Sequence, residues 1–285
     1  MRSNPVKDAL QRGENAFGTM NIELTSPGLP AILASAGADF ALYDMEHSGF
    51  DLDEMKRQFS YMRGLDLVPI VRPPGKQYQF VSRLLDLGAM GLMMPMVESA
   101  EEAREIVSWT RYPPKGQRGA MFGGAHDDYA GGDIAEKMRI AEERTIVLAM
   151  IETERGVANV DEIMAVDGID GAHLGQFDLS LSLGIPGQTD SPRINEAIDA
   201  MLAACQRHGK FAACMAPTVE IARAWMDRGF TMVSYSYDIG LLSNGLADGH
   251  RQSTPHQAHH QQPSPQTKQS SGQSRHRTAC GQPPE

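Results

Sequence analysis

Cysteine is scarce in this chain and is not arranged in pairs. The three cysteines, Cys205, Cys214 and Cys280, are an odd number, and none lies in a CxxC motif. This pattern supports neither a disulfide framework nor a thiolate metal site. Cys205 and Cys214 are expected to behave as small buried hydrophobic residues. A reducing compartment is therefore the expected environment.

The chain also lacks an excess of basic residues. Its 26 Lys and Arg against 36 Asp and Glu give a net charge of -10. This balance argues against a nucleic-acid partner, because such binding relies on Lys and Arg to neutralise phosphates, and it offers an anionic membrane no polybasic segment. No apolar run is long enough to cross a bilayer, and residues 1–18 contain no apolar signal-peptide core. We expect a cytoplasmic protein with no nucleic-acid or membrane partner.

Apolar side chains nearly disappear after Gly249. Residues 250–285 are rich in Gln, His, Ser and Pro, and their only apolar side chains are Ala258, Ala279 and Cys280. Such a segment buries too little surface to offset its ordering entropy. A His-rich tract can bind metal weakly, but we interpret this one as a solvated tail without a catalytic role. The sequence thus predicts one domain over residues 1–249 and a disordered tail over 250–285.

Within the predicted domain, short apolar runs alternate with helix-like segments. Several runs are apolar almost throughout, as expected of parallel strands buried on both faces, and the helix-like segments open with acidic residues and stop at glycines. The predicted strands are 16–22, 40–45, 67–72, 89–97, 145–151, 168–174, 211–215 and 231–237. The predicted helices are 52–64, 77–88, 99–110, 160–166, 194–209 and 218–229.

Eight strand-like runs with helical connections predict an α/β fold of the (β/α)8 TIM-barrel type. A doubly wound open sheet is the alternative. No GxGxxG motif follows the first run, so a dinucleotide site of that fold is poorly supported.

Polar residues gather where four of the predicted strands end. In a TIM barrel the active site lies at the C-terminal ends of the strands, so these residues should converge on one mouth. They are Asp44-Met45-Glu46-His47 after the second strand, Arg72-Pro73-Pro74 at the third, Glu152-Thr153-Glu154 after the fifth and Gly175-Gln176-Phe177-Asp178 after the sixth.

This set of residues is chemically coherent. The carboxylates of Glu152 and Asp178 suit a hard divalent cation such as Mg²⁺, which takes one or two protein carboxylates and keeps waters for substrate oxygens to replace. The planar fork of Arg72 suits a carboxylate or a developing enolate oxygen. His47, next to an acid, suits a general base. A metal, an arginine and a histidine base are the groups needed to form and hold an enolate.

Each of these residues also has a structural interpretation. Glu152 and Asp178 could cap loops or pair with Arg155, Arg72 could pair with Glu46, and His47 could be an ordinary loop histidine. Because side chains alternate along a strand, we expect only one of Asp44 and Glu46 to face the mouth. The lone histidines His126 and His173 are interpreted as structural.

The order and spacing of several motifs resemble the HpcH/HpaI aldolase family of class II pyruvate aldolases. The resemblance covers residues 18–248. The matching blocks are D-x-E-H at 44–47, V-R-P at 71–73, L-L-D-x-G-A at 84–89, R-Y-P-P-x-G-x-R-G at 111–119, I-E-T at 151–153 and D-L-S at 178–180. So many ordered blocks form a more specific signal than any single motif.

The resemblance implies a carbon-carbon lyase that cleaves a 4-hydroxy-2-oxo acid to pyruvate and an aldehyde through a pyruvate enolate. Under it, Glu152 and Asp178 match the ligands of a divalent Mg²⁺, Mn²⁺ or Co²⁺ ion. Arg72 matches the arginine that holds the pyruvyl oxygen, and His47 matches the base, with Asp44 as its partner. It also implies a homohexamer built as a trimer of dimers.

Two positions depart from the family pattern. The family reads G-P-x-D-L-S where this chain has Gly175-Gln176-Phe177-Asp178, which alters the loop that borders the substrate carboxylate. The family often has Gln where this chain has Met150, which removes a hydrogen-bonding side chain near the predicted metal. Two alternatives stay open: a CoA lyase related to the citrate lyase β subunit, and a catalytically silent binding protein of the same fold, which the changed Gln176-Phe177 loop supports.

Overall fold

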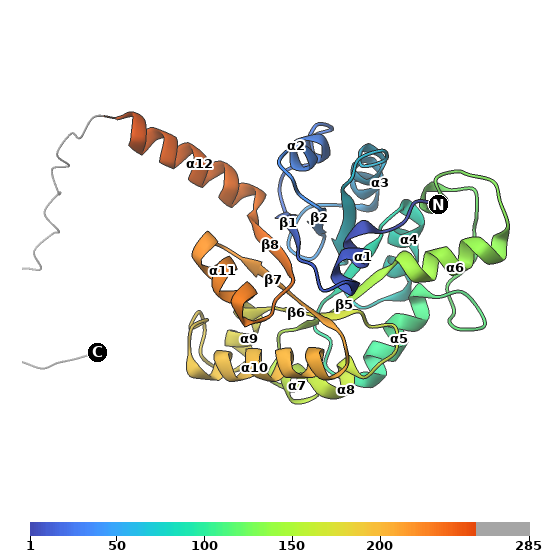
Figure 1. Ribbon diagram of the computed structural model, residues 1–285. Coiled ribbons are helices and arrows are strands. Elements are labelled where there is room, and N and C mark those ends of the chain that lie inside the picture. Colours follow the sequence, from blue (N-terminus) through green and yellow to red (C-terminus); the bar gives the residue numbers. More distant parts are fainter. Residues whose placement is uncertain (255–285) are drawn as a thin grey trace, which may run out of the picture. The chain divides into compact units, whose positions relative to one another are not determined.

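Eight parallel strands close into a barrel in which each strand is hydrogen-bonded to the next and β8 returns to β1 (Figure 1). The structure, a computed structural model, describes residues 1–254. The strands are β1 (Ala16–Asn21), β2 (Phe40–Asp44), β3 (Val68–Arg72), β4 (Gly91–Met94), β5 (Ile146–Ile151), β6 (Gly171–Leu174), β7 (Phe211–Ala216) and β8 (Met232–Tyr237). Each lies within or beside one predicted run, so the predicted TIM-barrel fold is confirmed.

Helices surround the strands, as Figure 1 shows. Six of them correspond to predicted helices: α3 (Leu52–Tyr61), α4 (Tyr78–Leu87), α5 (Ala100–Thr110), α8 (Val160–Met164), α10 (Pro192–Arg207) and α11 (Val219–Arg228). The structure adds α1 (Pro5–Gln11), α2 (Leu29–Ser35), α6 (Ile134–Arg144), α7 (Glu154–Ala158), α9 (Gln176–Ser182), α12 (Asp238–Ser253) and the short 3-10 helix η1 (Ala125–Asp127).

Alternate residues of the strands face the interior of the barrel, because strand side chains have a period of two. Phe40 and Leu42 of β2, Ile70 of β3 and Leu148 of β5 belong to one buried apolar cluster inside it. Val6 and Leu10 of α1 join the same cluster, so this helix closes the N-terminal end of the barrel. Two strands change character at their last inward position, where Asp44 and Arg72 stand.

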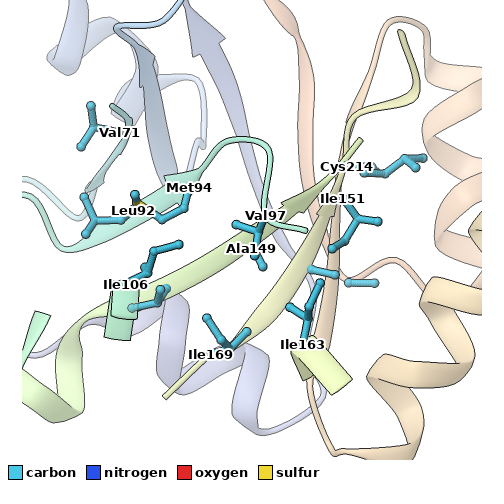
Figure 2. Packing of buried hydrophobic residues seen from close by; sticks show 14 of the residues in the cluster. Val71, Leu92, Met94, Val97, Ile106, Ala149, Ile151, Ile163, Ile169 and Cys214 are labelled. Carbon is cyan, nitrogen blue, oxygen red and sulfur yellow. The ribbon is translucent and has the colours of Figure 1, made fainter. Parts of the chain in front are cut away.

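The outer face of the strands forms a second apolar core with the helices. Figure 2 shows Leu92 of β4 near Ile106 of α5, and Ile151 of β5 near Ile163 of α8, and Val71 of β3 belongs to the same cluster. This double burial explains why the strand sequences are apolar at nearly every position. The last strand residues are therefore held from both sides, which gives the C-terminal ends fixed positions.

The predicted domain boundary falls inside a helix. A compact unit spans Met1–Gly245, and α12 runs to Ser253, so the first residues assigned to the tail are helical. The remainder of the predicted tail, residues 255–285, lies outside the described residues. Within residues 1–254, no helix combines the length and apolar character needed to cross a membrane.

Candidate active site

Arg72 is the buried centre of the predicted site. It is the last residue of β3 and lies in register with Asp44, the last residue of β2. Its Nε and Nη2 atoms donate to the two carboxylate oxygens of Asp44 at 2.7 and 2.6 Å, and both side chains are buried. This bidentate pair fixes the plane of the guanidinium, so Arg72 presents a preorganised cation at the C-terminal end of the barrel.

Glu46 also reaches Arg72. Its Oε2 atom lies 3.2 Å from Nη1 of Arg72, so the expectation that only one of Asp44 and Glu46 would face the mouth is wrong. Residues two apart along an extended chain share a face, and both carboxylates converge on one guanidinium. Burial raises the pKa of Glu46, although the charge of Arg72 opposes that shift.

His47 stands at the edge of this group, with a largely exposed side chain. Its Nε2 atom lies 3.9 Å from Glu46 Oε2. The structure places Asp44 against Arg72 and brings Glu46, not Asp44, next to the imidazole. The resemblance implied Asp44 as the partner of His47, whereas in this structure the acid beside the imidazole is Glu46.

Glu152 follows β5 directly and is 2% exposed. Its Oε1 atom accepts a hydrogen bond of 2.6 Å from the backbone N–H of Met96, a contact that the sequence did not indicate. Burial raises the pKa of Glu152 to about 7, and the nearby negative charge of Asp178 acts in the same direction, against the Met96 donor and Arg72. An acid buried beside another acid is a typical arrangement for a cation site.

The segment after β6 begins a helix instead of forming the expected loop. Gln176 is the first residue of α9 and is buried, whereas Phe177 is 61% exposed. Asp178 lies in the first turn of this helix, where a negative charge is favoured by the helix dipole. Of the three residues predicted to border the substrate, Phe177 is the one open to solvent.

Gly175 allows Glu152 to sit against the start of α9. A Cβ atom at position 175 would lie 2.6 Å from both Cβ and Oε2 of Glu152, which is far inside contact distance. Only glycine leaves Glu152 in this position. Position 175 thus contributes to the site by having no side chain. This leaves room for Glu152 beside the first turn of α9, which carries Asp178.

Met150 and His173 are register partners on β5 and β6, and each lies two residues before a residue of the site, Glu152 and Gly175 respectively. The sulfur of Met150 is 3.7 Å from Arg72 Nη1, so an apolar side chain stands where the family often has Gln. His173 is buried, and neither ring nitrogen has a hydrogen-bond partner among the described residues. Its burial lowers the pKa of the imidazole to about 3, so this histidine is neutral.

The donor set fits a hard divalent cation held by few protein groups. No cluster of three or more His, Cys, Asp and Glu side chains suited to a metal occurs within residues 1–254. Glu152 and Asp178 would be the protein ligands, in keeping with the one or two carboxylates that Mg²⁺ takes alongside water and substrate oxygens. A cation would also offset the charge repulsion that raises the pKa of Glu152.

A hollow of about 800 Å³ lies at the opposite end of the barrel, between Leu10, Phe211 and Thr231. Its basic residues are already engaged: Lys210 donates to the carbonyl of Ile169 at 2.6 Å, and Arg228 pairs with Asp199 at 2.7 Å. The N-terminal end of a TIM barrel serves stability, and the C-terminal end carries the chemistry. We therefore place the candidate site around Arg72 and Glu152.

Carboxylates, an arginine and a histidine thus stand at the C-terminal mouth of a TIM barrel, and the comparisons with known proteins identify its family. Residues 19–245 match the family described as HpcH/HpaI aldolase/citrate lyase. This chain belongs to that family.

Relatives of this chain include proteins named as two types of aldolase. It is 36% identical over 242 residues to a hydroxypyruvate/pyruvate aldolase of Roseobacter denitrificans, covering 85% of this chain and 93% of the relative. It is 33% identical over 248 residues to a 5-keto-4-deoxy-D-glucarate aldolase of Shigella sonnei, covering 86% and 96%. The crystal structure of an HpcH/HpaI aldolase from Desulfitobacterium hafniense superposes with a TM-score of 0.83 at 32% identity, covering 88% and 97%.

Proposed function

We propose that this protein is a metal-dependent aldolase that cleaves a 4-hydroxy-2-oxo acid into pyruvate and an aldehyde. The proposal is carried by two observations at one barrel mouth: a buried Arg72 that is preorganised by its bidentate pair with Asp44, and a buried Glu152 whose pKa is shifted by its burial and by the nearby charges of Asp178 and Arg72. Membership of an aldolase family supports the same reaction. The relatives act on hydroxypyruvate, pyruvate and a keto-deoxy sugar acid according to their names, so a short polar 2-oxo acid is the substrate class that we propose.

The protein groups divide the work of the cleavage. His47, beside Glu46, removes the proton of the 4-hydroxyl group. The C3–C4 bond then breaks, the aldehyde leaves, and the electron pair passes to the 2-keto oxygen of the remaining enolate. Arg72, which is held in place by Asp44, donates to that oxygen as its charge develops. Protonation at C3 completes pyruvate.

Glu152 and Asp178 would hold the divalent cation. When bound, the ion would supply Lewis-acid stabilisation of the negative charge on the 2-oxo acid. The chain's own contribution is a desolvated acid at 152, which Gly175 and the Met96 N–H fix in position. Mg²⁺, Mn²⁺ and Co²⁺ are the proposed ions, since oxygen ligands suit all three.

Oxaloacetate decarboxylation tests the enolate site without knowledge of the aldehyde, because it forms the same enolate. Purified protein should release pyruvate in the presence of Mg²⁺, Mn²⁺ or Co²⁺, should stop with EDTA, and should lose activity in Arg72→Ala and Glu152→Ala. Release of pyruvate that is insensitive to EDTA would refute the metal. A folded protein that is inactive with every ion would support the silent binding protein.

Two further points stay proposals. A CoA lyase is the alternative enzyme, and a thioester assay with acetyl-CoA and oxaloacetate would distinguish it. We also propose the trimer of dimers that the family resemblance implies, which multi-angle light scattering would test.

A further inference from the structure

The loop after β4 passes directly over the candidate metal ligand. Met96 lies in this loop, and its N–H donates to Glu152 Oε1 at 2.6 Å. The next residue, Val97, is tied to β5, because its N–H donates to the carbonyl of Met150 at 3.2 Å. One peptide of the loop thus reaches the site while its neighbour is fastened to the barrel.

Met96 adopts an unfavourable backbone conformation to make this contact. Its φ is +53°, in the left-handed region that side chains with a Cβ atom rarely occupy. The side chain of Met96 is 42% exposed, so packing of that side chain does not account for the conformation. A strained residue persists only where its surroundings hold it.

The surroundings that hold Met96 come from Lys76. The Lys76 ammonium donates to the Met96 carbonyl at 2.5 Å and pairs with Glu102 Oε2 at 2.9 Å. The same Glu102 oxygen accepts the N–H of Glu98 at 2.9 Å, so the carboxylate that anchors Lys76 is itself fixed. Lys76 therefore bridges the N-terminal part of α5 and the loop above Glu152.

Lys76 also belongs to the loop that carries the arginine of the site. It stands four residues after Arg72, between β3 and α4. The Lys76 contacts therefore connect the segment after Arg72 to the segment that orients Glu152. The distance between Arg72 and Glu152 matters, because both would act on the same substrate.

We propose that Lys76 is a positioning residue: it binds the Met96 carbonyl, keeps Met96 in the left-handed conformation and so aims the Met96 N–H at Glu152. This inference rests on the proposed function, in which Glu152 holds the metal. It assigns to Lys76 no contact with substrate. The residue acts through one peptide group and sets the orientation of a ligand.

Electrostatics and positioning predict opposite effects of removing Lys76. Loss of a cation near a metal site would by Coulomb's law strengthen metal binding. Loss of a group that orients a metal ligand weakens metal binding, and contacts of this kind to a ligand are typically worth about 10–100-fold in metal affinity. The direction of the change thus identifies the role.

The experiment is a Mn²⁺ titration of the full chain, with free Mn²⁺ followed by electron paramagnetic resonance. Lys76→Met should weaken Mn²⁺ binding at least about tenfold, and Lys76→Arg should restore most of the loss. Lys115→Met, at an exposed lysine paired with Glu142, is the matched control and should bind Mn²⁺ like the wild type. Circular dichroism checks folding; if Lys76→Met does not fold, Glu102→Gln removes the anchoring charge and should shift binding in the same direction.

A second variant tests whether the effect passes through Met96. Glycine adopts the left-handed conformation without strain, so Lys76→Met should cost less in a Met96→Gly background than in the wild type. An equal loss in both backgrounds, or unchanged or tighter Mn²⁺ binding in Lys76→Met, overturns the inference while the proposed function stands. A wild-type protein that binds no Mn²⁺ overturns both.

Discussion

Glu152→Gln should stabilise the metal-free protein at alkaline pH. The Glu152 carboxyl is 2% exposed, and its pKa rises from 4.5 to about 7 on folding, chiefly through burial. Between these pH values the unfolded chain releases a proton that the folded chain keeps, so stability falls as the pH rises. Above pH 7 the difference is fully developed and corresponds to about 3 kcal/mol, at ~1.36 kcal/mol per pH unit. Glutamine is neutral and can still accept the Met96 N–H.

Urea unfolding in excess EDTA at pH 5 and pH 8.5 measures this effect. Wild type and Glu152→Gln should differ little at pH 5, and the variant should be more stable by about 3 kcal/mol at pH 8.5. Saturating Mn²⁺ should stabilise the wild type and not the variant. Glu105→Gln, at an exposed glutamate of α5, is the control. The same pH dependence in wild type and Glu152→Gln would refute the reasoning.

Three other substitutions should have distinct effects. Arg72→Ala should lower oxaloacetate decarboxylation about 10²–10³-fold and, by leaving Asp44 buried without its partner, should destabilise the protein by about 3 kcal/mol in urea; equal stability would contradict the buried pair. His173→Leu should resist acid better than the wild type. The buried imidazole has a pKa of about 3 in the folded protein, whereas the unfolded chain binds a proton there below about pH 6.5, so the wild type loses stability as the pH falls. Thermal melting at pH 7.5 and at pH 5 would show whether the melting temperatures of the two proteins separate at the lower pH. Gly175→Ala should reduce both Mn²⁺ affinity and turnover, since its Cβ collides with Glu152; Gly28→Ala, whose Cβ would meet nothing within 4 Å, is the control, and equal behaviour of the two variants would contradict the close approach.

The sequence predicts the barrel well because both faces of its strands are buried. Residues such as Ile70 and Val71 face opposite cores, so the chain must be apolar at both, and the run is visible without knowledge of its neighbours. Helix length does not decide which helices are found, because α6 has 11 residues, as many as the predicted α5. α6 was missed although Asp133 and Glu136 form the start signal that the structure uses, with the Asp133 side chain accepting the Glu136 N–H.

The residues of the candidate site can be named from the sequence, but the contacts between them cannot. Positions at the ends of strands identify Asp44, Arg72 and Glu152, because fold class alone fixes where strand ends meet. Which acid pairs with Arg72 depends on side-chain reach, and the structure gives it both Asp44 and Glu46. The Met96 donor could not be foreseen, since a positive φ at a residue other than glycine leaves no mark in the sequence.

The change from apolar to polar at the last inward position of β2 and β3 has a consequence for how this enzyme could diversify. The layers that contain Phe40, Leu42 and Ile70 hold the barrel together, whereas the layer of Asp44 and Arg72 stands above them. Substitutions beyond that upper layer, as at the exposed Phe177, would change the mouth of the barrel without disturbing the apolar layers below it. Selection for a new substrate would act on the layer of Asp44 and Arg72 and on the loops beyond it, and selection for a stable fold would act on the apolar layers below. Such a barrel can therefore change its specificity without changing its fold.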